Sequence, residues 1–443
     1  MHGSCPKLLE VKGSFWAIAL KKLFFVNILY NLTFVIPTGV DFTVKHYNVK
    51  GVLIKLDFFV RVLCLLSCSC RGCGFVLSLS RDIELFKHRE HLKLSKKLGE
   101  LLFDRLKLSS AAAKRTAKGQ WSTDEKTLSR LVDSHPVINS ILEYRSCTKL
   151  KSTYVEKLVS VIDEDSRVHT TYNQAFTETG RLSSENPNLQ NIPVRTRRGK
   201  NIRKAFVPRD ENHVILAADY SQIELRIMAA MSGDKAMLEA FRNGEDIHRD
   251  TASRVYNVMP AFVTPEQRSK CKMVNFGIIY GISPFGLSQR LKISRKEATE
   301  LIDIYFKMYP GVQKYMNEMI ESARKLGYAQ TILGRRRVLR DINSRNLTQR
   351  QSAERDAINT PIQGSAADLI KMAMVKVDRA VREAGLSSKM VLQIHDELVF
   401  DAPKEEAEEL EKIVRREMTG AYDFGVPIEV SIGIGANWLE AKI

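Results

Sequence analysis

Apolar residues recur every three or four positions in two stretches, 95–108 and 122–162, and this spacing predicts amphipathic helices. Serine and threonine stand where such helices begin, so we expect them to act as N-caps. Lysine and arginine fill many of the polar positions. Most of these charges fit a solvated helix face, although a basic helical arm also suits the backbone of a nucleic-acid duplex.

The pattern changes after residue 176. Residues 177–193 are dense in Gly, Ser, Asn and Pro and predict a loop, and the apolar run 212–219 predicts a buried strand. Helical spacing then continues to about residue 385. Short apolar runs within 389–403 and 426–435 predict further strands. We therefore expect an α+β fold in which a long helical insertion interrupts one sheet.

Residues 1–92 follow neither pattern. The apolar runs 15–36 and 51–66 are broken by charged residues that would be costly in lipid, so we expect no transmembrane helix there. An amphipathic region and sequence foreign to the functional domain both fit this segment.

Composition adds a partner. The chain has 443 residues, 44% hydrophobic and 27% charged, which is ordinary for a globular protein of two to four domains. Its net charge of +17 indicates a polyanionic partner, most often nucleic acid, although a merely basic surface remains an alternative.

Cysteine usage indicates a compartment. Seven cysteines, four of them within 64–73, do not form the framework of a secreted protein, so we expect a reducing compartment. The order of Cys70, Cys73, His88 and His91 is similar to that of zinc-finger ligands. The two histidines are, however, closer together than in the usual pattern.

Acidic residues stand at the ends of two predicted strands. Asp219 ends the strand 212–219, and Asp396 and Glu397 lie between the apolar halves of the hairpin 389–403, which has no Asn-Gly turn. If these strands are neighbours, Asp219 and Asp396 lie a few ångströms apart and repel unless cations bridge them. Oxygen-rich sites of this kind suit Mg²⁺, and paired Mg²⁺ ions serve reactions at phosphorus.

A simpler interpretation of the first acid also exists. Ser221 and Glu224 match the S-x-x-E pattern of a capping box, which would start a helix at Ser221. Asp219 would then be a turn residue, and Glu224 would only cap the helix.

Residues 268–281 form a helix with an unusual polar face. Arg268, Lys272, Phe276 and Tyr280 are spaced by four, which places them on one side of a helix. Their order matches a nucleoside triphosphate, with phosphates at the cations and the base and sugar at the aromatic rings. Cys271, Val274 and Ile278 fall on the opposite, packing side. An ordinary amphipathic helix would instead place its aromatic residues among these three.

A second row of four-spaced residues suits duplex DNA. Arg355, Asn359 and Gln363, with Arg181 in the loop, can reach minor-groove acceptors that are alike in every base pair. Taken singly, they would be weak evidence, because Asn and Gln often only cap a helix or face solvent.

Together these motifs resemble family A DNA polymerases of the bacterial DNA polymerase I type. "DYSQIELR" (219–226), R-x3-K-x3-FG-x2-YG (268–281) and "HDE" (395–397) are similar to motifs A, B and C of that family, and "TGRLSSENPNLQNIP", "DIHR" and "GRRR" to further stretches. The resemblance extends from about residue 93 to the C-terminus. It implies a right-hand polymerase fold with an antiparallel-sheet palm (176–234 and 346–443), helical fingers (235–345) and a helical thumb (93–175).

The resemblance also implies roles. It assigns two Mg²⁺ ions to Asp219, Asp396 and the Tyr220 carbonyl, and makes Glu397 an auxiliary carboxylate. The expected catalytic set is Asp219, Asp396, Glu397 and Lys272. The residues expected to bind the dNTP are Arg268, Lys272, Phe276, Tyr280, Gln222, Glu224 and His248. Those expected to bind primer–template DNA are Arg181, Arg355, Asn359, Gln363 and His395.

The resemblance therefore implies a monomeric, template-directed DNA polymerase that acts in replication or repair without membrane contact. It also implies a cytoplasmic location associated with the bacterial nucleoid. Only three acidic residues precede Asp82, too few for a two-metal exonuclease cluster, so we expect no proofreading. A single-subunit RNA polymerase is one alternative, but Glu224 leaves little room for a ribose 2′-hydroxyl. A non-catalytic DNA-binding remnant is another, but all core carboxylates and the four-spaced row are intact.

Overall fold

The computed structural model describes residues 95–108, 114–194 and 196–442, so the predictions for residues 1–92, including the Cys64–Cys73 cluster, lie outside it. The described residues form two compact units, of which one ends at Glu156 and the other begins at Lys157. The first unit is helical, as its spacing predicts. Its elements are α5 (Ser95–Gly99), η1 (Glu100–Arg105), α6 (Glu125–Ser129), α7 (Pro136–Leu150) and η2 (Lys151–Glu156).

The caps of this unit differ from the prediction. Asp124 caps α6 by accepting a hydrogen bond from the Thr127 amide at 2.6 Å. His135 caps α7, because its Nδ1 accepts from the Val137 amide at 3.1 Å. The expected Ser and Thr caps are therefore wrong for these two helices. Pro136 has no N–H and a fixed φ suited to a first helical residue, which explains why α7 begins there.

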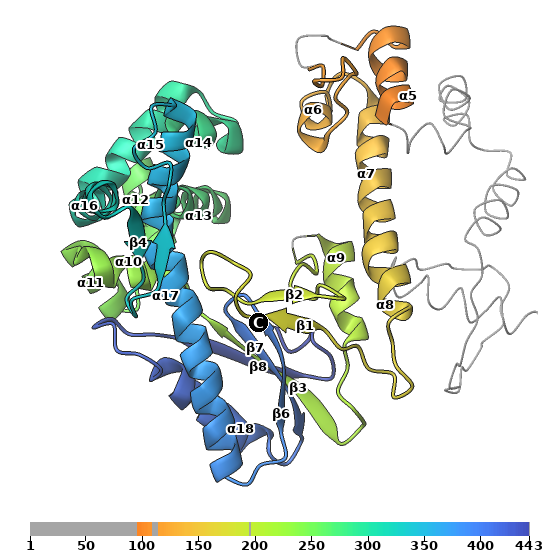
Figure 1. The fold of residues 1–443 in the computed structure, drawn as a ribbon, viewed down its shortest axis with the longest axis vertical. Coiled ribbons are helices and arrows are strands. Elements are labelled where there is room, and N and C mark those ends of the chain that lie inside the picture. The colour runs from red at the N-terminus through yellow and green to blue at the C-terminus, as the bar shows by residue number, and fades with distance from the viewer. Residues whose placement is uncertain (1–94, 109–113, 195, 443) are drawn as a thin grey trace, which may run out of the picture. The chain divides into compact units, whose positions relative to one another are not determined.

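The second unit is built on one antiparallel sheet, ordered β6-β7-β3-β8 (Figure 1). The strands are β3 (His213–Tyr220), β6 (Lys389–Ile394), β7 (Glu397–Pro403) and β8 (Val430–Gly435). Leu216 and Phe400 are opposite one another in β3 and β7 and are fully buried, because the alternating apolar side chains of both strands face a common core. The predicted sheet, interrupted by helices, is confirmed.

Helices of the second unit pack on this sheet and extend away from it. They are α8 (Lys157–Val159), α9 (Arg197–Asn201), η3 (Ile202–Ala205), α10 (Ile223–Ser232), α11 (Lys235–Arg242), α12 (Ile247–Tyr256), η4 (Pro260–Phe262), α13 (Pro265–Ile279), α14 (Pro284–Leu291), α15 (Arg295–Met308), α16 (Pro310–Leu326), α17 (Leu347–Glu383) and α18 (Ala407–Thr419). α18 packs on β3, β7 and β8.

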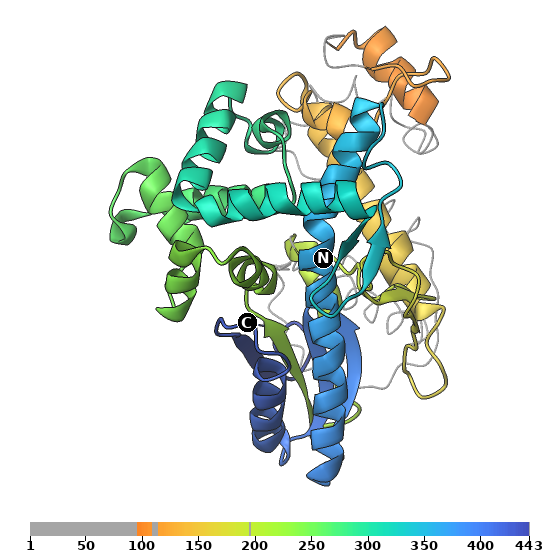
Figure 2. The same cartoon turned by 60° about the vertical axis from the view of Figure 1, so that its left-hand side comes forward.

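The 37-residue helix α17 connects the two parts of this unit. It packs on α18 beside the sheet and on α10 and α16 of the insertion, and Figure 2 shows it running from one part to the other. Pro361 lies inside the helix and is buried. Because proline has no backbone N–H, one hydrogen bond is missing at the middle of this long element.

Two short hairpins were not expected. Within the predicted loop 177–193, β2 (Ser183–Glu185) pairs with β1 (Thr171–Asn173). Within the helical insertion, β4 (Tyr328–Gln330) pairs with β5 (Arg336–Val338). In the part of the chain that the structure describes, no helix combines the length and the apolar character needed to cross a membrane.

Candidate active site

The strand register gathers the acidic residues at one end of the sheet. β3 and β7 are antiparallel neighbours with Asp219 opposite Glu397, and the Tyr220 amide donates to the Asp396 carbonyl at 3.1 Å. His395 and Asp396 form a two-residue turn between β6 and β7, where His395 has a φ of 56° in the left-handed region. The two strands expected to be neighbours are neighbours, and Asp219 lies beside the Asp396–Glu397 pair.

Glu397 is held by two hydrogen-bond donors from the segment after β8 and by one ion pair with a residue of η3. Trp438 Nε1 donates to Oε1 at 2.8 Å, and Lys442 Nζ donates to Oε2 at 2.7 Å. Arg203 Nη1 lies 3.5 Å from Oε2. Only 2% of Glu397 is exposed, so these two hydrogen bonds and the ion pair offset the cost of burying its charge.

Both aspartates have a raised pKa, so burial disfavours their ionised forms. The pKa of Asp396 is raised to about 6, mainly by burial and also by the Glu224 and Asp219 carboxylates, while Arg181 opposes the shift. Burial also raises the pKa of Asp219, although Lys442 opposes this shift. A divalent cation would stabilise both ionised groups, and carboxylate oxygens are the ligands that Mg²⁺ prefers. The donor set therefore fits Mg²⁺.

Helix α13 carries the row expected to bind phosphate and base. It starts at a capping box of Thr264 and Gln267, and its buried side contains Cys271, Val274 and Ile278, as predicted. Phe276 and Tyr280 are stacked, with ring centroids 6.4 Å apart and planes at 26°. Tyr280 is the residue after the last turn of the helix rather than part of it.

The N-cap of α12 and one residue within that helix contact the row on α13. Asp246 caps α12 and forms an ion pair with Arg268, with Oδ2 2.5 Å from Nε. His248 is 1% exposed, and its ring lies 5.6 Å from that of Phe276. Burial, reinforced by Lys272 and Arg268, lowers the pKa of His248 to about 4, so it is neutral at pH 7. Its Nε2 is buried without a hydrogen-bond partner among the described residues.

Glu224 is not a helix cap. Helix α10 begins at Ile223, and its N-cap is Gln222, which has a φ of 52° and makes no side-chain capping bond. The predicted start at Ser221 and its capping box are therefore wrong, because the left-handed turn at Gln222 delays the helix by two residues. Glu224 instead pairs with Arg181, whose Nη2 lies 2.7 Å from Oε1, and accepts a hydrogen bond from the Tyr280 hydroxyl.

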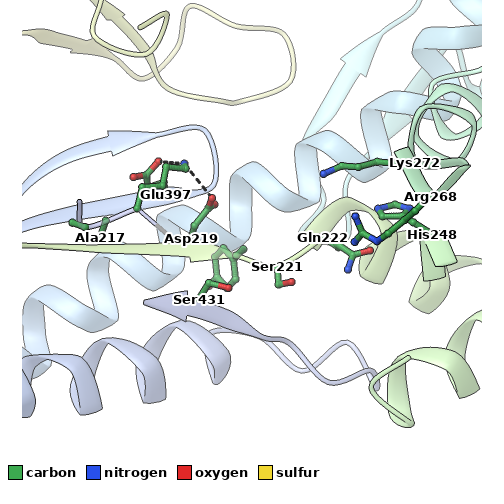
Figure 3. A pocket seen from close by; sticks show the side chains of 12 residues that line it. Ala217, Asp219, Ser221, Gln222, His248, Arg268, Lys272, Glu397 and Ser431 are labelled. Atoms are coloured by element: carbon green, nitrogen blue, oxygen red, sulfur yellow. Dashed lines mark hydrogen bonds and ion pairs between the residues drawn. The ribbon is translucent and has the colours of Figure 1, made fainter. Parts of the chain in front are cut away.

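A cavity of about 280 Å³ lies between the carboxylates and the cationic row. Figure 3 shows Asp219 and Glu397 on the strands, with Lys272, Arg268 and His248 on the helices facing them. The other lining residues are Ala217, Tyr220, Ser221, Gln222, Ser431, Ala441 and Lys442. Of the other residues expected to hold the metal or the dNTP, Asp396, Glu224, Phe276 and Tyr280 lie outside this lining. The expected DNA contacts Arg181, Arg355, Asn359, Gln363 and His395 lie outside it as well.

The row on α17 lies apart from the cavity lining. Arg355 is exposed, whereas Asn359 and Gln363 are half-buried on the same helix. The Asn359 Oδ1 atom is buried without a hydrogen-bond partner among the described residues. A buried acceptor of this kind is available to a donor from outside the chain.

Four contact residues were missed by the sequence analysis. Asp246 had a visible signal, because it belongs to the quoted "DIHR" and is a typical N-cap type. Trp438 stands out as the one tryptophan in residues 436–442, a weaker signal. Arg203 and Lys442 had none, since each is one basic residue among many.

Known proteins resemble this chain over most of its length. The family described as DNA polymerase family A matches residues 78–440. DNA polymerase I of Streptococcus pneumoniae (strain TIGR4) is 45% identical over 90% of this chain and 45% of its own length. DNA polymerase I of Geobacillus stearothermophilus is 48% identical over 82% of this chain and 41% of its own.

A solved structure shares the fold. The POL domain of Pol1 from M. smegmatis, in complex with DNA primer-template and dNTP, superposes with a TM-score of 0.75 and 46% identity, covering 80% of this chain and 62% of that one. This chain spans somewhat less than half the length of the two curated relatives. The strand-end carboxylates and the cationic helix facing them thus lie within a matched region, and the chain belongs to DNA polymerase family A.

Proposed function

We propose that this protein is a template-directed DNA polymerase that adds dNMP from a dNTP to a primer 3′-hydroxyl and releases pyrophosphate. The observation that carries the proposal is one cavity lined by Asp219 and Glu397 from the sheet and by Lys272, Arg268 and His248 from the helices. Acids suited to a cation thus face side chains suited to a triphosphate. The solved M. smegmatis relative, in complex with DNA primer-template and dNTP, supports the same reading.

Two Mg²⁺ ions are the proposed cofactors, held by Asp219, Asp396 and the Tyr220 carbonyl. When bound, such ions lower the pKa of an attacking hydroxyl and neutralise charge on a leaving phosphate. Asp396 is partly buried among other acids, so its carboxylate gains most from a cation. Glu397 has both oxygens occupied by Trp438 and Lys442, and we assign it a supporting role beside the metal ligands.

The chain's own groups orient the nucleotide. Lys272 and Arg268 neutralise phosphate charge, and Arg268 first has to leave Asp246, its partner in the free enzyme. His248 is buried and neutral, and its Nε2–H would donate a hydrogen bond to a phosphate oxygen. Phe276 and Tyr280 provide a stacked apolar border for the base and sugar. Acceleration would come mainly from positioning and charge stabilisation.

Duplex contacts and subdomain roles complete the proposal. Arg181, Arg355, Asn359, Gln363 and His395 would contact primer–template DNA, with Asn359 contributing an unpaired acceptor. Residues 93–175 would act as the thumb, 176–234 and 346–443 as the palm, and 235–345 as the fingers. We also propose that the polymerase acts as a monomer in the bacterial cytoplasm.

A primer-extension assay with Mg²⁺ tests the function. Wild-type protein should extend a primer with dNTPs and far less with rNTPs. Asp219→Asn and Asp396→Asn should each abolish extension while duplex affinity stays nearly unchanged, because phosphate contacts from Lys and Arg dominate that affinity. Extension by either variant at a near wild-type rate would contradict the metal assignment, and no extension by the wild type would contradict the function.

A further inference from the structure

The last turn of the chain folds back onto the sheet beside the carboxylates. After β8, Asn437 Oδ1 accepts hydrogen bonds from the Leu439 and Glu440 amides, both at 3.1 Å, and the Ala441 amide donates to the Asn437 carbonyl at 3.0 Å. A Cβ on Gly435 would lie 2.6 Å from the Ala441 nitrogen, so only glycine permits this close return. The turn is thus a defined element that directs Lys442 toward the end of β3.

Trp438 anchors the turn. Its side chain is fully buried, and its amide donates to the Phe206 carbonyl at 2.9 Å. The indole lies edge-on to Phe206, with ring centroids 5.4 Å apart, and beneath the Arg203 guanidinium at 3.9 Å. These contacts fix the backbone four residues before Lys442, so the position of its ammonium group is constrained.

The Lys442 ammonium bridges two carboxylates on neighbouring strands. Nζ lies 2.7 Å from Glu397 Oε2 and 3.4 Å from Asp219 Oδ2, the contacts drawn as dashed lines in Figure 3. Its side chain is only 32% exposed, so solvent screens these contacts incompletely. Arg203 also lies near Glu397, but among the described residues Lys442 is the cation that contacts both acids. Removing its charge would therefore increase the repulsion between the two acids that face each other across β3 and β7.

Asp396 has a different cationic neighbour. The favourable charge that acts on it is Arg181, which also pairs with Glu224. The two aspartates proposed as metal ligands are therefore unequal: Asp219 is already partly neutralised by a chain ammonium in the free enzyme, and Asp396 is not.

We propose that Lys442 is a positioning residue that holds Asp219 and Glu397 together in the free enzyme and competes with the divalent metal for Asp219. This inference rests on the proposed function, because it takes Asp219 as a metal ligand. The ammonium lowers the repulsion that would displace the strand ends, and it weakens metal binding by placing a positive charge beside a ligand. Glu397 retains Lys442 when the metal takes Asp219, since the Glu397 contact is the shorter of the two.

Direct metal binding tests the inference without catalysis. Mn²⁺ is titrated into free enzyme, and unbound Mn²⁺ is followed by electron paramagnetic resonance. Lys442→Met keeps the length of the side chain and removes the charge, so Mn²⁺ should bind roughly three- to ten-fold more tightly. Lys442→Arg keeps the charge and should bind Mn²⁺ as the wild type does. Lys412→Met controls for net charge, because Lys412 on α18 is far more exposed and pairs with Glu408 and Glu409 of its own helix. This variant should also match the wild type.

Three results would overturn the inference: an unchanged Mn²⁺ affinity in Lys442→Met, the same gain in Lys442→Arg, or the same gain in Lys412→Met. Circular dichroism melts of each variant show that the proteins compared are folded. Primer extension by wild-type protein is measured on the same preparations. If extension fails while the Mn²⁺ difference holds, the proposed function fails and the competition for Asp219 stands.

Discussion

At the scale of single residues, Glu224 had two interpretations from the same S-x-x-E pattern: a helix-capping residue or a contact of the dNTP sugar. It is 5% exposed, pairs with Arg181 and accepts a hydrogen bond from the Tyr280 hydroxyl, so its carboxylate is held by side chains and does not cap the helix. We expect Glu224 and Tyr280 to form a wall against C2′ of the incoming sugar. A ribose 2′-hydroxyl at this wall would clash or leave a buried charge without a partner, at a cost on the order of a few kcal/mol.

Glu224→Ala should therefore lower the preference for dNTPs over rNTPs by at least roughly ten-fold and also slow dNTP incorporation. Glu297→Ala is the matched control, because Glu297 forms a true capping box with Ser294 on α15. That variant should lose about 1 kcal/mol of stability and keep the sugar preference. The measurement is the ratio of incorporation rates, and equal ratios in wild type and Glu224→Ala would rule out the wall.

Asp396 gives a second prediction, for stability against pH. Its pKa is about 6 in the folded, metal-free protein and ordinary when unfolded, so the folded state binds more protons between about pH 4 and 6. Its contribution to stability is therefore greatest below pH 4 and is lost as the pH rises through 6. Urea unfolding in EDTA should show Asp396→Asn gaining on the order of 1–2 kcal/mol over wild type between pH 4 and pH 7, after allowance for solvent. Parallel curves for the two proteins would contradict the shift.

At the scale of elements, the start of α12 restrains the cationic row of α13. Asp246 caps α12 through the His248 and Arg249 amides and also pairs with Arg268 at 2.5 Å. Asn caps helices as well as Asp does, so Asp246→Asn keeps α12 and weakens the ion pair. The Michaelis constant for dNTP should fall about two- to five-fold, because Arg268 is released for phosphate. Asp378→Asn, in an exposed pair on α17, should leave it unchanged, and an unchanged constant in Asp246→Asn would contradict the restraint.

Elements also show where sequence patterns stop being informative. The sheet, the helical insertion and the packing side of α13 followed from local spacing, because apolar periodicity records which face is buried. The start of α10 did not follow, since Gln222 adopts a left-handed conformation that glycine or asparagine usually signals. Lys442 lies 223 residues from Asp219 in sequence, so only the path of the folded chain brings the two together.

At the scale of the whole molecule, 68 basic residues against 51 acidic ones predict strong dependence of DNA binding on salt. If six or more phosphates are neutralised, duplex affinity should fall roughly a thousand-fold or more between ~50 and ~200 mM salt. Fluorescence anisotropy with a labelled primer–template measures this slope. Asp219→Asn should give the same slope as the wild type, because its charge change lies at the metal site. A nearly flat slope would mean that the basic residues serve solubility rather than DNA.

The length of α17 has a mechanical consequence. This helix of 37 residues is about 55 Å long. It packs against α18 beside the sheet and against α16 of the insertion, so it links the two mechanically. The hydrogen bond missing at Pro361 makes this the point where the helix bends most easily, with Asn359 and Gln363 on either side of it. A tilt of the insertion against the sheet would therefore bend α17 near Pro361. The Asn359 and Gln363 side chains would then change direction together.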